Sequence, residues 1–422
     1  MTEVPRAERG SRISAAYRGL VRWAPLVLAV AVLTRLLWTV LTPNGTNFVD
    51  LHVYVDGSAA LLRGDLYGFT YSEETPDFPL PFTYPPFAAL VFLPLHYLPF
   101  GLVGFCWQLG TVLALFWVIR ISLELLLGDT ARERHWQHVA MLWTAIGVWT
   151  EPVRTTLDYG QVNVFLVLGA MLAVRSTRWW VSGGIVGILA GIKLTPAVTG
   201  LYFLAQRRWR AAVFSAVAFA GTVGVSYLVI SAQARDYFSS KFGDADRIGP
   251  VGSAWNQSLR GALSRIAGHD VGSGPVWIAG VVVAAALAVF AWSALARDDR
   301  LGTLLLVELF GLLVSPISWV HHWVWVLPML IWLFYGPYRH LVGTRVVAAC
   351  WLAVTVIGVP WVLHQFEGES ISRAGALAWA GTVNVTGALV VFLWVGYAGR
   401  RYAAKPTLPV RRSVEPAPDR TS

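Results

Sequence analysis

A carboxylate suited to general base chemistry stands at Asp50, in the polar stretch NGTNFVDLHVYVDGSAALLRGDLY (44–67). A positioned carboxylate can take a proton from a hydroxyl group as that hydroxyl attacks a substrate. Asp50 directly precedes a segment with helical spacing, so capping that helix is an alternative or an additional role. A capping side chain is held rigidly, which also suits a general base. The later acids Asp56 and Asp65 are expected to be ordinary solvated acids.

The segment behind Asp50 carries apolar residues at helical spacing, namely Leu51, Val55, Ala59 and Leu62. This pattern predicts an amphipathic helix in the first loop after the first apolar run. A helix with one apolar face and one polar face lies flat on a membrane surface. We therefore expect Asp50 at the boundary between water and lipid.

Three cationic side chains occupy positions that suit phosphate binding. Lys193, in GILAGIKLTPAV, lies between two apolar runs, and an intramembrane lysine is costly and usually functional. Extension of its side chain to the interface is the alternative. If the helix breaks here, Lys193 beside the start of a half-helix makes a phosphate site. Arg260, in SAWNQSLRGALSRIAG, and Arg35, inside the first apolar run, are the other predicted donor-phosphate ligands.

A histidine pair, His321 and His322, stands in SPISWVHHWVWVLP. Adjacent residues on a helix diverge by about 100°, so the two rings do not easily share one metal ion, and no HExxH spacing accompanies them. We predict no metal site. One ring that faces inward could bind a phosphate or a sugar hydroxyl, and the sequence leaves open which one. Glu308 is a buried rival to Asp50 as the base, or else a paired structural acid.

Polar groups of the kind that bind sugars recur near the predicted outer helix ends. They are Asp158, Gln161 and Asn163 in LDYGQVNVFLVLGA, Asn256 in the outer loop, and Tyr84 in the proline-rich DFPLPFTYPPFAALVFLPL. We expect these residues to bind the acceptor or another sugar. Helix capping and hydrogen bonds between helices are the alternative for the polar side chains.

The composition predicts the elements that must position these groups. The chain of 422 residues is 56% hydrophobic and 14% charged, against about 25% charged in soluble domains. Apolar runs of about 17–25 residues, each long enough to cross a bilayer, predict an all-α polytopic membrane protein with about twelve transmembrane helices. The runs lie near 23–41, 82–98, 101–126, 137–153, 160–175, 180–204, 209–231, 273–295, 301–316, 319–335, 342–363 and 375–397.

Basic residues in short loops orient the chain. They predict a cytoplasmic N-terminus (1–22), one membrane domain (23–397) with outer loops at about 42–81 and 232–272, and a disordered cytoplasmic tail (398–422). The net charge of +9 then reflects cytoplasmic loops and not nucleic-acid binding. Two full crossings between 82 and 126 would put the charged stretch GDTARERHWQH outside. We therefore expect a half-length or re-entrant helix near 82–98, and the same question applies to 180–204.

Nucleotide-binding motifs are missing from the sequence: it has no P-loop and no GxGxxG after a strand. An activated donor must therefore arrive within the membrane. A base, cations and sugar-binding groups at one interface indicate transfer from a lipid phosphate.

Six stretches, in order, resemble the polyprenol-phosphate-mannose-dependent α-1,2-mannosyltransferases, glycosyltransferase family 87, which have the GT-C membrane fold. They are FVDLHVYVDGSAALLRGDLY, PFTYPPFAALVFLPL, YGQVNVFLVLGAMLAV, GIKLTPAVTGLYFLAQRRWRAA, NQSLRG and SPISWVHHW. The resemblance covers residues 22–397. Within the family, TPNGTNFVDLHVY and TPDFPLPFTYPPFAA are most similar to the enzymes that extend phosphatidylinositol mannosides.

The resemblance implies an inverting transferase with no cofactor in the outer leaflet of the bacterial inner membrane. Its donor would be polyprenyl phosphomannose and its acceptor a mannosylated phosphatidylinositol, extended at a 2-hydroxyl. The family's catalytic acid corresponds to Asp50. Two alternatives remain open: the same reaction on lipomannan or lipoarabinomannan, or a flippase for lipid-linked sugars without transferase activity.

Overall fold

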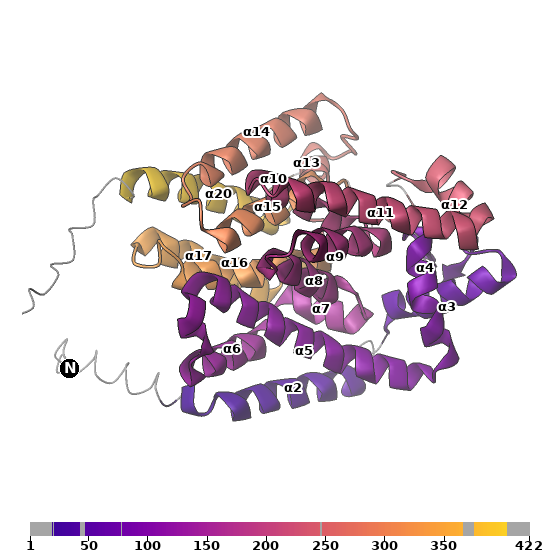
Figure 1. The fold of residues 1–422 in the computed structure, drawn as a ribbon, viewed down its shortest axis with the longest axis horizontal. Helices are drawn as coiled ribbons and strands as arrows, with labels where there is room; N and C mark the ends of the chain where they lie inside the picture. Colours follow the sequence, from indigo (N-terminus) through magenta and orange to yellow (C-terminus); the bar gives the residue numbers. More distant parts are fainter. Residues whose placement is uncertain are drawn as a thin grey trace, which may run out of the picture.

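The structure, a computed structural model, is almost entirely helical (Figure 1) and confirms the all-α prediction. It describes residues 19, 21–42, 47–76, 78–244, 247–365 and 375–402. Most of the predicted cytoplasmic N-terminus and most of the predicted tail lie outside these residues. The only strands in the described part are β1 (Thr70–Tyr71) and β2 (Leu80–Pro81), which pair antiparallel.

Six helices in the described residues are long and apolar enough to cross a membrane. A bent pair, α7 (Glu151–Tyr159) and α8 (Asn163–Arg175), turns by 118° and would add a seventh span if both belong to one crossing. The six are α2 (Ala24–Leu41), α5 (Phe100–Leu127), α11 (Trp209–Val229), α14 (Pro275–Trp292), α17 (Val342–Ile357) together with α18 (Val359–His364), and α20 (Val383–Tyr402).

The remaining apolar runs form shorter helices, so the predicted count of about twelve spans is not confirmed. The longest of them, α15, has 15 residues and is about 22 Å long, less than a hydrocarbon core of about 30 Å. They are α4 (Pro86–Phe92), α6 (Arg134–Gly147), α9 (Trp179–Ile192), α10 (Thr199–Ala205), α15 (Arg300–Val314) and α16 (Val326–Tyr335). Three further short helices are α12 (Ser231–Asp236), α13 (Leu259–Ala267) and α19 (Ala376–Ala380).

The outer helices expose apolar side chains instead of burying them. On α11, Val213 is 65% exposed and Leu228 87% exposed, and on α14, Val282 is 61% exposed. Water would make such surfaces costly, whereas lipid tails suit them. These helices therefore face the bilayer.

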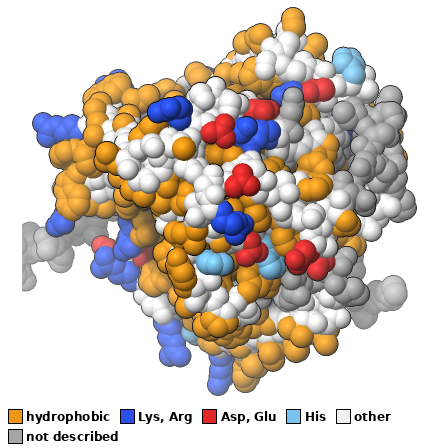
Figure 2. Space-filling model, turned by 90° about the vertical axis from the view of Figure 1, so that its right-hand side faces the viewer, with side chains coloured by type: hydrophobic (Ala, Val, Ile, Leu, Met, Phe, Trp, Pro, Cys, Tyr) orange, Lys and Arg blue, Asp and Glu red, His pale blue; other side chains and the backbone are white. Residues whose placement is uncertain are grey.

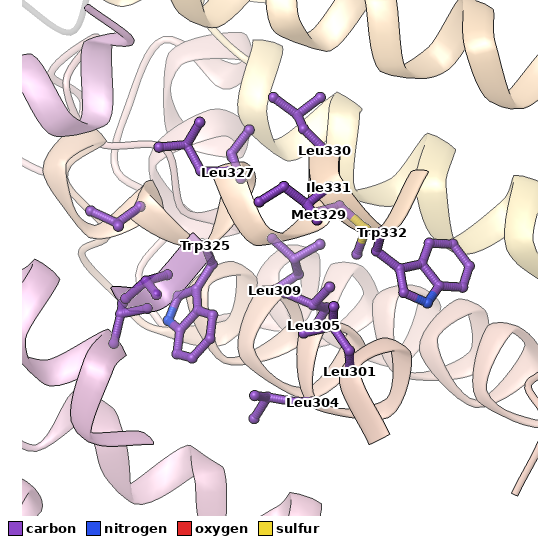
Figure 3. Close-up of a cluster of buried hydrophobic side chains, with 14 of the residues drawn as sticks. Leu301, Leu304, Leu305, Leu309, Trp325, Leu327, Met329, Leu330, Ile331 and Trp332 are labelled. Carbon is purple, nitrogen blue, oxygen red and sulfur yellow. The ribbon is translucent and has the colours of Figure 1, made fainter. Parts of the chain in front are cut away.

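The interior is packed around α15 and α16 (Figure 3). Leu301, Leu305 and Leu309 are spaced four residues apart and share one face of α15. They pack against the helix that carries Met329 and Ile331, and all five side chains are at most 1% exposed. This core holds the end of α15 and the histidine segment in fixed positions.

Two predicted irregularities are present. Helix α4 has seven residues and continues as a five-residue 3-10 turn, η2 (Leu93–Tyr97). This segment is too short to cross a bilayer, as expected for a half-length helix near 82–98. The run at 180–204 breaks where α9 ends at Ile192, and Lys193 is extended before the 3-10 turn η4 (Thr195–Val198).

A glycine seam brings α9 close to α11. Gly183, Gly187 and Gly191 recur every fourth residue along α9. A Cβ at Gly183 would lie 2.5 Å from the Ala211 carbonyl oxygen, and one at Gly187 would lie 2.6 Å from Cβ of Ala218. Small residues let membrane helices approach to backbone contact in this way. The seam fixes α9 and hence the position of Lys193 at its end.

The helix predicted behind Asp50 is present as α3 (Val49–Ala60), but it is not an amphipathic surface helix with one solvent-exposed polar face. Nine of its twelve residues are buried, including Leu51, Val55 and Ala59. Tyr54 and Ala60, which the amphipathic pattern leaves off the apolar face, are also buried. Helix α3 thus packs in one apolar cluster with side chains of α4, α5 and α8, such as Ala88, Val103 and Leu166.

Candidate active site

A cavity of about 940 Å³ collects most of the predicted site residues. Its outer part is formed by the two outer loops, at the end of the molecule that carries α3, α4 and α12 (Figure 1). Figure 2 shows this end, where acidic and basic side chains gather among hydrophobic ones. Seven predicted residues line the cavity: Asp50, Tyr84, Gln161, Asn163, Lys193, His321 and His322.

Asp50 lies in the first turn of α3 and is not its N-cap. The helix begins at Val49, and the N-cap is Phe48, whose backbone is left-handed (φ 42°). A phenylalanine in this conformation is strained, and such strain concentrates at functional sites. The Phe48 amide donates to the Asp158 carbonyl at 3.1 Å, and the ring packs edge-on against Phe100. These contacts hold the start of α3 and point Asp50 into the cavity.

The environment of Asp50 suits a general base. Desolvation raises the pKa of this carboxyl from 3.8 to about 6. A hydrogen bond with Gln161 and the positive charge of Lys193 oppose this rise without cancelling it. A base works best when its pKa is close to the working pH. Asp50 is therefore ionised at neutral pH and readily accepts a proton.

Among the cations that line the cavity, Lys193 is the one whose charge acts on Asp50. Its ammonium donates to Oδ1 of Asn163 at 2.9 Å and to Oε1 of Gln161 at 3.3 Å, and it lies 5.5 Å from the ring centroid of Tyr84. The side chain is 8% exposed. Its partners are neutral apart from the nearby Asp50 charge, so the ammonium remains available to an incoming anion.

Tyr54 was not predicted from the sequence as a site residue, yet its hydroxyl contacts two residues of the cavity lining, Gln161 and Tyr84. Its hydroxyl donates to Oε1 of Gln161 at 2.9 Å and lies 3.2 Å from the hydroxyl of Tyr84. Tyr54 follows Asp50 by four residues on α3 and therefore shares its helix face. That spacing was the signal that could have identified it.

The sequence left open which histidine faces inward. In the structure, both His321 and His322 line the cavity. They lie in the 3-10 helix η6 (Val320–Trp325), with ring centroids 4.8 Å apart. Neither nitrogen of the His321 ring has a hydrogen-bond partner, and Nδ1 of His322 has none. The backbone carbonyl of His321 accepts from the Asn163 amide at 2.9 Å. The two rings thus offer free polar atoms to a ligand.

Arg35 and Asp158 are not in the cavity lining, contrary to the predicted roles in phosphate and sugar binding. They form an ion pair with each other between α2 and α7. Arg35 also donates to the Thr39 hydroxyl at 2.8 Å, and its side chain is 3% exposed. A buried arginine inside a membrane helix needs such a partner, and the pair is a structural link.

Arg260 and Asn256 also lie outside the lining. The Arg260 guanidinium holds the Asp270 carboxylate with two hydrogen bonds, of 3.0 and 2.5 Å. The Asn256 amide donates to the Val251 carbonyl, and its oxygen accepts from the Ser318 amide, both at 2.9 Å. Asn256 therefore fastens the outer loop to the segment before the histidines and has no polar atom left for a sugar.

The cavity contains further charged residues. Lys241, Asp244 and Arg247, from the second outer loop, and Glu308, from α15, also line it. The two cations were missed because an outer loop rich in charge resembles any solvated loop. Among the described residues, no group of three or more His, Cys, Asp or Glu side chains is placed to hold a metal ion.

Comparison with known proteins agrees with this geometry. The family model of glycosyltransferase family 87 matches residues 82–316. The chain is 56% identical over 383 residues (90% of this chain and 92% of the relative) to the polyprenol-phosphate-mannose-dependent alpha-(1-2)-phosphatidylinositol pentamannoside mannosyltransferase of Mycolicibacterium smegmatis. It is 54% identical to the Mycobacterium tuberculosis protein of the same name, over 91% of this chain and 89% of that protein.

A more distant relative is the Mycobacterium tuberculosis polyprenol-phosphate-mannose-dependent alpha-(1-2)-phosphatidylinositol mannoside mannosyltransferase. The chain is 33% identical to it over 67% of this chain and 69% of that protein. No solved structure matches the chain. A matching family model over more than half of the sequence, together with relatives that align along nearly its whole length, shows that the chain belongs to glycosyltransferase family 87.

Proposed function

We propose that the protein transfers mannose from polyprenyl phosphomannose to the 2-hydroxyl of a mannosylated phosphatidylinositol. The names of the closely similar relatives state this donor, linkage and acceptor class for those proteins. One observation on this chain supports the chemistry most directly: the Asp50 carboxylate and the Lys193 ammonium line the same cavity. Acceptor deprotonation needs the first group, and phosphate departure needs the second.

Asp50 acts as the general base in this proposal. It takes the proton of the acceptor 2-hydroxyl while that oxygen attacks the anomeric carbon of the donor mannose. The bond from this carbon to the phosphate oxygen breaks on the opposite face, and polyprenyl phosphate leaves. A β-linked donor then yields an α-1,2 product, so the reaction inverts the configuration.

Lys193 and the histidine pair would stabilise the leaving phosphate. Negative charge grows on the bridging oxygen as the bond breaks. A fixed ammonium in a poorly hydrated site interacts strongly with such charge. The free ring nitrogens of His321 and His322 add hydrogen bonds to the phosphate or to a sugar hydroxyl.

The proposed setting is the periplasmic side of the bacterial inner membrane. Basic clusters assign the opposite ends of the helices to the cytoplasm, and the outer part of the cavity is formed by the two loops assigned to the outer side. On this topology, 23–397 is one membrane domain that carries the catalytic cavity.

The decisive experiment uses the purified full-length protein in detergent, labelled polyprenyl phosphomannose, and a panel of acceptors. We expect labelled product with phosphatidylinositol mannosides, and linkage analysis should show an α-1,2 bond. Product only with lipomannan or lipoarabinomannan would change the proposed acceptor. Because detergent leaves no membrane to transport across, absence of any product would overturn transferase activity and favour a flippase.

A further inference from the structure

Glu308 is a buried carboxyl group that the proposed reaction does not use. It lines the cavity from the middle of α15 and is 4% exposed. Its Oε1 accepts a hydrogen bond from the Thr199 hydroxyl at 2.6 Å. Leu312, one turn further along α15, also lines the cavity, as do the apolar residues Val167, Ala170 and Val198.

The carboxyl group is only partly satisfied by the protein. A carboxylate offers about four lone-pair positions on two oxygens, and one hydroxyl fills one of them. Within the described residues, no ion pair neutralises Glu308. Burial of a carboxyl group with so few partners is costly, and an ionisable residue in a membrane interior is therefore retained for function more often than for stability.

Glu308 lies in the middle of α15, whereas Asp50 lies in the first turn of α3, in the first outer loop. Ser315 directly follows the end of α15 and also lines the cavity. It lies seven residues after Glu308, which corresponds to about 10 Å along the helix. Asp50 instead contacts Gln161, at the turn between α7 and α8. The two carboxyl groups thus mark two levels of one cavity.

We propose that Glu308 binds sugar hydroxyls at a deep subsite of the cavity, an inference that rests on the proposed function. A hexopyranosyl ring presents neighbouring hydroxyl donors that suit the two oxygens of one carboxyl group. A prenyl chain presents no donor and would leave Glu308 unsatisfied. The deep end therefore takes a sugar ring of the donor or of the acceptor, and the prenyl chain leaves the cavity elsewhere.

The test compares Glu308→Gln and Glu308→Leu with Glu151→Gln as a matched control. Glu151 is also a buried carboxyl, 1% exposed, but it lies outside the lining and accepts from the Trp361 amide at 2.7 Å. Initial rates would be measured against polyprenyl phosphomannose and against a phosphatidylinositol mannoside acceptor. Each KM is determined with the other substrate saturating.

We expect Glu308→Leu to raise the KM of one substrate about tenfold, because it removes the hydrogen bonds between the carboxyl group and the sugar hydroxyls. Its kcat should change little, because the lost contact holds substrate and transition state alike. The substrate affected identifies whose sugar occupies the subsite. Glu308→Gln keeps one acceptor oxygen and should raise the same KM by a smaller factor, and Glu151→Gln should leave both KM values unchanged.

Unchanged KM values in both Glu308 variants, with only a lower Tm, would overturn the inference and make Glu308 structural. If the Leu variant fails to purify, the isosteric Gln variant decides the matter: a raised KM supports the subsite and an unchanged KM overturns it. Wild-type protein without transferase activity would instead contradict the proposed function, so the two failures are distinguishable.

Discussion

The Lys193 ammonium donates to the side-chain oxygen of Asn163 at 2.9 Å, which ties the end of α9 to the start of α8. This bond holds a cation in the cavity opposite the first outer loop. Asp50 lies close enough for the Lys193 charge to affect its pKa. A negative and a positive group, supplied by segments 143 residues apart in sequence, thus share one cavity.

Lys193→Ala should weaken donor use more than acceptor use, because the ammonium faces the leaving phosphate. Removal of a hydrogen bond to a charged group costs about 1.5–3 kcal/mol, so kcat/KM for polyprenyl phosphomannose should fall about 10- to 100-fold. Steady-state kinetics with each substrate varied would measure the effect. Arg260→Ala is the control, since Arg260 binds Asp270 outside the cavity. A change confined to acceptor KM would contradict the phosphate role.

Asp50→Asn should abolish measurable transfer, because a general base contributes about 10²–10⁴-fold. The variant should still insert and purify, since an amide replaces a desolvated carboxylate. Asp56→Asn is the matched control on the same helix: Asp56 pairs with His52 at 2.8 Å and is not part of the cavity lining. Near-native turnover of Asp50→Asn in a labelled-donor assay would assign the base to another residue.

The pH dependence follows from the pKa of Asp50, raised to about 6. The base works only when ionised, so kcat/KM should be constant above this value and fall about tenfold per pH unit below it. The effect on stability has the opposite sign. The folded state favours the protonated form of Asp50. The stability that this preference contributes is therefore fully present below about pH 4 and is lost as the pH rises through about 6.

Two measurements check these signs. The kcat/KM of the wild type should be recorded between pH 5 and 8 with a saturating second substrate. In parallel, the Tm of Asp50→Asn should exceed that of the wild type at neutral pH, and this difference should shrink toward pH 5. A flat rate profile across pH 6 would exclude Asp50 as the titrating base.

Much of the site was predictable because its chemistry demands rare residues in unusual places. Lys193 stands between apolar runs and Asp50 follows the first one, and both line the cavity. Arg35 and Asp158 satisfied the same criterion but bind each other. Sequence shows that a buried charge needs a partner, but not whether that partner is a ligand or a side chain 123 residues away.

The fold was predictable in class and not in the number of crossings. Apolar runs reveal burial, but a helix covered by other helices is as apolar as one in lipid. Helices such as α15 and α16 are buried in the core and are too short to span a bilayer. The left-handed backbone conformation of Phe48, two residues before Asp50, could not be predicted from the sequence either. Glycine is the usual residue in this conformation, and phenylalanine gives no sign of it.

Gly187→Ala should destabilise the seam between α9 and α11. The new Cβ would lie 2.6 Å from Cβ of Ala218, so the helices must separate, at a cost of about 1–3 kcal/mol. The shift would also displace Lys193 and lower kcat/KM for the donor. Gly184→Ala on the same helix is the control, because its Cβ would meet only Phe214, at 3.6 Å. The two variants gain equal helix propensity, so a difference in Tm isolates the packing. Equal Tm values would contradict close contact along the seam.

Arg35→Met should destabilise the protein, because it leaves the largely buried Asp158 carboxylate, 19% exposed, without its ion-pair partner. Loss of one member of a buried ion pair costs about 3–5 kcal/mol. The double variant Arg35→Met/Asp158→Asn removes both charges and should recover much of the lost Tm. Since neither residue lines the cavity, the double variant should also keep the wild-type KM for donor and acceptor. A double-mutant cycle on thermal unfolding and transfer rates measures both effects. Additive losses of Tm would contradict the ion pair, and a raised donor KM in a stable double variant would return Arg35 to the phosphate site.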